Sequence, residues 1–111
     1  MKRGEIWLVN LDPIKGREQA GTRPAMIISV AEFNHSGLEL VIVCPLTSKN
    51  KGFPTHIAIK PNESGLDKNS YIKTEDIRSI STKRLIKLIG CVPPNIIADV
   101  ELCLKRILDL K

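Results

Sequence analysis

Residues 5–11, with the sequence Glu-Ile-Trp-Leu-Val-Asn-Leu, form the clearest strand pattern in the chain. In an extended backbone, successive side chains point to opposite faces. The apolar side chains then divide into Trp7, Val9 and Leu11 on one face and Ile6 and Leu8 on the other. The turn pair Asp12-Pro13 ends the strand. Because both faces carry large apolar groups, we expect both to be at least partly covered.

Similar patterns follow along the chain. Further strands are predicted at residues 25–30, 38–46, 55–60, 70–73 and 76–80. Helical turns are expected at residues 31–34 and after Ser81-Thr82, whereas residues 85–91 fit neither a strand nor a helix clearly. From Pro94 onward, apolar residues recur at steps of three and four, which predicts one amphipathic helix with proline at its first position.

These patterns predict a mainly β protein with a C-terminal helix. Short strands separated by turn signals are typical of a small, strongly curled sheet or a partly open barrel, against which the helix would pack. A chain of 111 residues has room for one ordinary domain, so we expect residues 1–111 to fold as a single unit. Aromatic residues make up only 4% of the chain, so the core must consist of Ile, Leu and Val.

Composition also bears on location and partners. The longest nearly unbroken apolar stretch, residues 40–46, is far shorter than the roughly 20 residues that span a bilayer, and we expect a cytoplasmic protein without membrane contact. The three cysteines, Cys44, Cys91 and Cys103, are widely separated in apolar surroundings, which favours buried, reduced thiols. A net charge of +5 permits a polyanionic partner without requiring one.

Several kinds of chemistry lack the residues they need. His35 and His56 are the only histidines, and no cluster of residues has metal-ligand spacing, so the sequence predicts no metal site and no cofactor. The chain also lacks a GxxxxGK[ST] phosphate loop, a GxGxxG turn and a GxSxG elbow. These absences count against nucleotide hydrolysis, hydride transfer and α/β-hydrolase chemistry.

Two long polar loops remain as candidate sites. In the first, residues 12–24, Pro24 restricts Arg23 to an extended backbone and so aims its guanidinium group. The second begins at Thr47, directly after a predicted strand, where hydroxyl and ammonium groups can face a phosphate. If the loops meet, Arg23 and Thr47 converge. The alternative is that Arg23 pairs with a carboxylate and Thr47 only ends a strand.

Six segments stand out along the chain: RGEIWLVNLDP at residues 3–13, Gly16, EQAGTRP at 18–24, CPLTS at 44–48, KGFP at 51–54 and DIRSI at 76–80. In this order, and over nearly the whole chain, they strongly resemble the MazF/PemK toxin family. The resemblance implies an SH3-like barrel of the CcdB/MazF/PemK type and a homodimer. It also implies a metal-independent endoribonuclease that blocks translation by cutting single-stranded RNA at short sequence motifs.

The resemblance further implies a type II toxin–antitoxin system, in which a cognate antitoxin covers the RNA groove. Given the basic charge of this chain, we expect the partly disordered tail of that antitoxin to be acidic. Three alternatives remain open. They are a toxin that poisons a topoisomerase on the same fold, as CcdB does, a non-catalytic SH3-like interaction module, and a degenerate toxin without activity.

The catalytic roles carried over from the family fall on Arg23, Thr47 and Glu18. Cleavage without a metal requires the 2′-hydroxyl of the scissile nucleotide to attack its own phosphorus. Arg23 and Thr47 would donate hydrogen bonds to the phosphorane oxygens. Because the pKa of arginine lies above about 12, we assign proton abstraction to Glu18 or to solvent.

A wider set of polar residues is expected to contact RNA. These residues are Asp12, Arg17, Gln19, Thr22, Ser48, Lys49, Lys51, His56, Lys73, Glu75 and Arg78. Some PemK-type members carry a histidine where Arg17 stands, and an Arg-x-Asp pair where this chain has Lys73-Thr74-Glu75. Lys73 and Glu75 could instead form a solvated ion pair at a strand end, and His56 could be an ordinary histidine of a strand edge.

Overall fold

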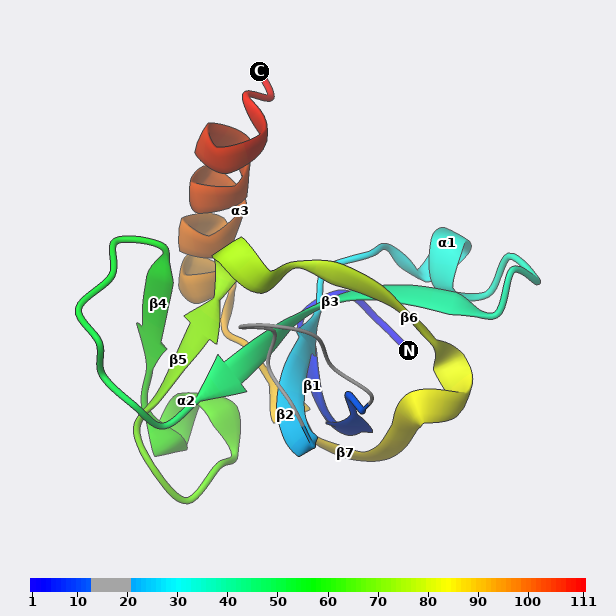
Figure 1. Cartoon of the computed structure of the whole chain (residues 1–111), viewed down its shortest axis with the longest axis horizontal. Coiled ribbons are helices and arrows are strands. Elements are labelled where there is room, and N and C mark those ends of the chain that lie inside the picture. Colours follow the sequence, from blue (N-terminus) through cyan, green and yellow to red (C-terminus); the bar gives the residue numbers. More distant parts are fainter. Residues whose placement is uncertain (13–20) are drawn as a thin grey trace.

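The computed structural model of the chain describes residues 1–12 and 21–111. This part is mainly a curled antiparallel sheet with one long helix beside it (Figure 1), as predicted. Its strands are β1 (Glu5–Asn10), β2 (Thr22–Ile27), β3 (Leu40–Thr47), β4 (His56–Ile59), β5 (Ser70–Lys73), β6 (Arg78–Ser81) and β7 (Leu85–Cys91).

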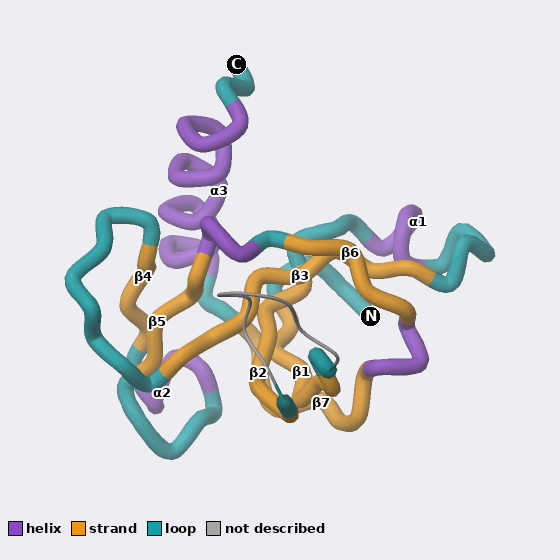
Figure 2. The backbone as a smooth tube through the Cα atoms, in the orientation of Figure 1, coloured by secondary structure: helices purple, strands orange, loops and turns teal. Residues whose placement is uncertain are grey.

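The helices are one long element and several single turns. Helix α3 (Pro94–Leu108) begins with Pro94 at its first position, as the sequence predicts. The short elements lie between strands (Figure 2) and are α1 (Ala31–Asn34), α2 (Pro61–Ser64) and the 3₁₀ turns η1 (Thr74–Asp76) and η2 (Thr82–Arg84). Ser81 caps η2 as expected, because its hydroxyl oxygen accepts the Lys83 backbone N–H at 3.2 Å. Within the described ranges, the chain forms no helix with the length and apolar character needed to cross a membrane.

Strand β3 connects the two parts of the sheet. One of its edges pairs with β2, where Ala25 lies opposite Pro45 and Ile27 opposite Val43. The other edge pairs with β6 along residues 40–43 and then with β5 at Leu46 and Thr47. Because β3 pairs with both β2 and β5, the strands follow the order β4-β5-β3-β2-β1-β7, and β6 also pairs with β3.

Two apolar clusters fill the two faces of this curled sheet. The first lies between the sheet and α3, and its buried members are Ile6, Met26, Cys44, Leu46, Ile59, Ile72, Val92, Ile96, Val100 and Leu104. The second is formed by Val9, Leu11, Ala25, Ile27, Val41, Val43 and Ile80. Strand β1 contributes Ile6 to one cluster and Val9 to the other, which confirms that both of its faces are covered. The buried apolar side chains of the described residues include no aromatic ring, as the composition predicts.

Some sequence expectations differ from the structure, and the predicted strands at residues 25–30, 38–46 and 76–80 have other ends in β2, β3 and β6. Strand β2 begins at Thr22 rather than at residue 25, because Thr22 and Arg23 pair with Asn10 and Val9 of β1. Residues 85–91, whose pattern is ambiguous, form β7, which pairs with β1 through a register that shifts twice. The prediction of a buried Cys91 is wrong, because Cys91 ends this strand and is exposed. Cys44 is buried as expected, and burial raises the pKa of its thiol to about 12.

Helix α2 packs closely on β7 at Gly90. A Cβ atom at this position would overlap the carbonyl oxygen of Ser64 and would lie 3.5 Å from Cα of Gly65. Gly65 itself ends α2 in the left-handed conformation, with φ of 80°. Glycine at residue 90 therefore allows the turn after α2 to rest directly on the backbone of β7.

Replacing Gly90 by alanine should lower the free energy of unfolding by about 2 kcal/mol, because the new methyl group forces α2 away from β7. A compatible glycine-to-alanine change would instead stabilise the fold by about 0.4 to 1 kcal/mol. Urea denaturation measures the difference. Because the backbone of Gly90 lies outside the left-handed region, a loss of stability at this residue measures the overlap and not backbone strain. A Gly90→Ala protein as stable as the wild type would contradict this packing.

Candidate functional site

Arg23 and Thr47 come together through the pairing of β2 with β3. In that register Ala25 lies opposite Pro45, and Ile27 lies opposite Val43. Continuing the register by two residues places Arg23 across from Thr47, at the point where β2 begins and β3 ends. Both residues line the same two cavities. The structure therefore joins the end of the first loop to the start of the second, as the convergence hypothesis requires.

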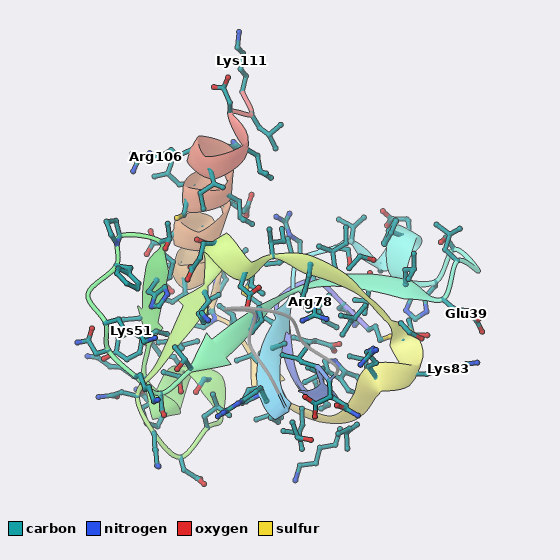
Figure 3. The ribbon with its side chains drawn as sticks, viewed as in Figure 1. Glu39, Lys51, Arg78, Lys83, Arg106 and Lys111 are labelled. Carbon is teal, nitrogen blue, oxygen red and sulfur yellow. The ribbon has the colours of Figure 1, made fainter. Side chains whose placement is uncertain are left out.

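The first cavity is small and cationic, with a volume of about 110 Å³. It is lined by Arg23, Thr47, Ser48, Lys49, Lys51, His56 and Lys73. Of these described residues, four carry a positive charge at neutral pH and none carries a carboxylate. In Figure 3, Lys51 lies on the β4 side of the molecule, well away from Arg78 in the middle of the sheet. This cationic cavity has the hydroxyl and basic groups that bind a phosphodiester.

The hydroxyl of Thr47 is oriented by the loop that follows it. Its oxygen accepts the backbone N–H of Lys49 at 3.2 Å. Because this bond uses a lone pair of the oxygen, the O–H proton remains available to donate to a ligand. Thr47 is therefore suited to donate a hydrogen bond into the cationic cavity.

His56 occupies the far wall of the cationic cavity and is held in place. Its side chain is only 3% exposed, and Nε2 lies 2.7 Å from a carboxylate oxygen of Glu75. The other oxygen of Glu75 accepts a hydrogen bond from the Thr55 hydroxyl at 2.9 Å, and the ring of Phe53 meets the imidazole edge-on at 5.3 Å. His56 begins the edge strand β4, as the alternative interpretation has it, and its ring is also held in place at the wall of the cationic cavity.

The acid Glu75 is stabilised in its charged form. Burial by itself would raise its pKa, but hydrogen bonds from His56, from its own backbone and from Thr55 outweigh that effect, so the pKa is lowered. The alternative of a Lys73–Glu75 ion pair is wrong, because the ammonium of Lys73 instead lies 3.9 Å from Asp76. The three-residue spacing of Lys73 and Asp76 within one turn was the signal that could have revealed this pair.

Other predicted residues lie apart from the two cavities. Asp12 accepts the Gly21 backbone N–H at 2.9 Å, which closes the base of the first loop. Arg84, which the sequence analysis missed, donates to the backbone carbonyls of Asn10 and Asp12. Thr22 begins β2 and Arg78 begins β6, and neither lines either cavity. The predicted residues Arg17, Glu18 and Gln19 lie outside the described residues.

The second cavity is larger, about 200 Å³, and shares Arg23, Thr47 and Ser48 with the cationic one. Its other lining residues are Pro24, Leu46, Leu66, Asp67, Lys68 and Ser70. The sequence analysis did not single out Leu66, Asp67 or Lys68, because these residues lie in the connection between α2 and β5, which carries no recognisable motif. For metals, the part of the chain that the structure describes brings no three His, Cys, Asp or Glu side chains together as a candidate site.

The lowered pKa of Glu75 predicts how stability depends on pH. A carboxyl group whose pKa is lower in the folded than in the unfolded state stabilises the fold above its unfolded value of about 4.3. That contribution is lost as the pH falls through the folded pKa. Glu75→Gln should therefore be less stable than the wild type at pH 7, and the difference should shrink as the pH falls below about 4. Thermal unfolding from pH 7 to pH 3 measures this, and a difference independent of pH would contradict the role given to Glu75.

Comparisons with known proteins show which family the chain belongs to. Residues 2–108 match the model of the PemK-like, MazF-like toxins of type II toxin–antitoxin systems. Endoribonuclease MazF9 from Mycobacterium tuberculosis is 37% identical over 115 residues, which cover 99% of this chain and 98% of that protein.

Two solved structures have the same fold. MazF from Deinococcus radiodurans superposes with a TM-score of 0.85 at 27% identity, covering 98% of this chain and 96% of that one. A MazE–MazF structure from the same organism gives a TM-score of 0.82 at 26% identity, covering 100% and 97%. The expected MazF-type fold is confirmed, and the chain belongs to the family of PemK-like, MazF-like toxins of type II toxin–antitoxin systems.

Proposed function

We propose that the protein is a sequence-specific endoribonuclease that cuts single-stranded RNA without a metal ion and so blocks translation. The observation that carries this proposal is the shared position of Arg23 and Thr47 in a cavity lined by four permanent positive charges. Family membership and the 37% identity to an endoribonuclease support the same reaction class.

The chemistry follows from the groups in the cationic cavity. The 2′-oxygen attacks phosphorus, a P–O2′ bond forms and the P–O5′ bond breaks, which leaves a 2′,3′-cyclic phosphate and a 5′-hydroxyl. Arg23 presents a fork of N–H donors to the charge that develops on the phosphorane oxygens. The O–H of Thr47 donates to the same group. Glu18 or solvent removes the 2′-hydroxyl proton, and the departing 5′-oxygen takes up a proton from Arg23 or from solvent.

The remaining cations would bind the RNA backbone on either side of the cut. Lys49 and Lys51 follow Thr47 in the loop, and Lys73 lies across the cavity on β5. Each phosphate contact of this kind releases counterions, so binding weakens as salt increases. His56 closes the cavity wall and is proposed to contact RNA, with Glu75 holding its ring in place.

We further propose that residues 1–111 form one domain that acts in the cytoplasm as a homodimer. The last turns of α3 extend past the sheet (Figure 1), and the exposed apolar side chains Leu102, Ile107 and Leu108 lie on different sides of this helix, where a second copy would cover part of them. A cognate antitoxin with an acidic tail would bind the basic groove. The MazE–MazF structure from Deinococcus radiodurans supports this partner class.

Incubation of the purified protein with a long single-stranded RNA in EDTA tests the reaction. We expect discrete cuts that end in cyclic phosphates. Arg23→Ala and Thr47→Ala should each slow cleavage by about 10²- to 10³-fold, because each removes a donor to the transition-state charge. Gel mapping of the fragments and their end groups measures the result.

Arg3→Ala is the matched control, because Arg3 lies in an exposed ion pair with Glu101 at 3.8 Å, away from both cavities. It should cut at the wild-type rate. Cleavage by Arg23→Ala or Thr47→Ala at the wild-type rate would remove that residue from the site. Absence of cutting by the folded wild-type protein across several RNAs would overturn the nuclease function itself.

A further inference from the structure

The second cavity adjoins the proposed cleavage point but differs from it in chemistry. Leu46, Leu66 and Pro24 give it apolar walls, and it meets the cationic cavity at Arg23, Thr47 and Ser48. An engineered cavity of about 150 Å³ holds one benzene molecule. A cavity of about 200 Å³ therefore has room for one flat ring system, and no phosphate would favour its apolar walls.

Asp67 provides the polar group of this second cavity. No hydrogen bond or ion pair joins its carboxylate to another described residue, although it is exposed beside Lys68 and the apolar walls. The segment that carries it is fixed at both ends. The Ser64 hydroxyl oxygen accepts the Leu66 backbone N–H at 3.0 Å, and the buried Ser70 hydroxyl donates to the Lys68 carbonyl at 3.2 Å. The backbone on both sides of Asp67 is therefore held, and its carboxylate can accept hydrogen bonds from whatever occupies the cavity.

We propose that the second cavity binds the base of a nucleotide next to the scissile phosphate, and that Asp67 selects bases with an exocyclic amino group. This inference rests on the proposed function, since it assumes that Arg23 and Thr47 hold the scissile phosphate. An ionised carboxylate accepts hydrogen bonds and donates none. Adenine, cytosine and guanine each present an amino group to it. Uracil presents a single N–H between two carbonyl oxygens, which the carboxylate repels.

The strength of the discrimination between bases depends on the free energy lost when the Asp67 carboxylate has no hydrogen-bond partner. A good polar contact to a base edge discriminates against the wrong base by a factor of about 10 to 100. Asp67 should therefore exclude uracil at one fixed position beside the cut and have no influence on the other positions. The apolar walls contribute affinity for any base, because they pack against its ring and form no hydrogen bonds to its edge.

Cleavage of a single-stranded RNA pool with randomised bases tests the proposal, with the cut ends sequenced. For the wild type, we expect uracil to be depleted about tenfold or more at one position adjacent to the cut. Asp67→Asn should restore uracil at that position alone, because an amide both donates and accepts and so pairs with a carbonyl and the N–H of uracil. Asp109→Asn is the control, since Asp109 lies at the exposed end of α3.

The outcomes separate this proposal from the one it rests on. A wild-type protein that cuts no RNA overturns the proposed nuclease function, and the base cavity with it. Cutting by Asp67→Asn with the base preferences of the wild type overturns the selection by Asp67 while leaving the nuclease intact. A slower Asp67→Asn enzyme with unchanged preferences at every position also overturns it, because the carboxylate would then act on structure alone.

Discussion

The antiparallel register between β2 and β3 is the constraint on which the candidate site depends. Continued two residues beyond the pair Ala25 and Pro45, it brings the second residue of β2, Arg23, toward the last residue of β3, Thr47, although 24 positions of sequence separate them. Because side chains alternate along a strand, a slip of one residue would turn Arg23 toward the opposite face and separate the pair. The apolar clusters fix that register, since Met26 and Cys44 belong to one cluster and Ile27 and Val43 to the other.

Charge is the second organising feature of the site. Arg23, Lys49, Lys51 and Lys73 converge on one cavity, where their mutual repulsion opposes folding. Among the described residues, the carboxylates bonded to this cluster do not themselves line the cavity. Asp76 pairs with Lys73, and Glu75 bonds to His56 and Thr55, so η1 supplies compensating negative charge from outside the cavity. These bonds offset part of the repulsion among the four cations.

Sequence patterns predicted much of the fold because local chemistry and tertiary packing agree. The proline at the start of α3, the cap at Ser81 and the strong alternation in β1 each have a local cause that the structure retains. Strand β7 could not be predicted, because it lies at the edge of the sheet with Ile86 and Leu88 exposed, so its pattern follows no single buried face.

The candidate site was predictable only in part. Arg23 and Thr47 stand in motifs, so the sequence identified them, and their convergence required only that two predicted strands be neighbours. Asp67 and the bond between His56 and Glu75 depend on contacts across 19 or more positions and between elements whose pairing the sequence does not specify. The family resemblance pointed to the phosphate-binding side of the groove, whereas the adjoining cavity emerged only from the three-dimensional structure.

The most direct test of this account is the crystal structure of the protein with a single-stranded RNA that carries a 2′-deoxy nucleotide at the cleaved position. Without the 2′-hydroxyl, the RNA cannot be cut and stays bound. The account predicts that non-bridging oxygens of the adjoining phosphate lie about 2.7 to 3.1 Å from the Arg23 guanidinium and from the Thr47 hydroxyl. A bound RNA whose phosphates contact neither Arg23 nor Thr47 would contradict it.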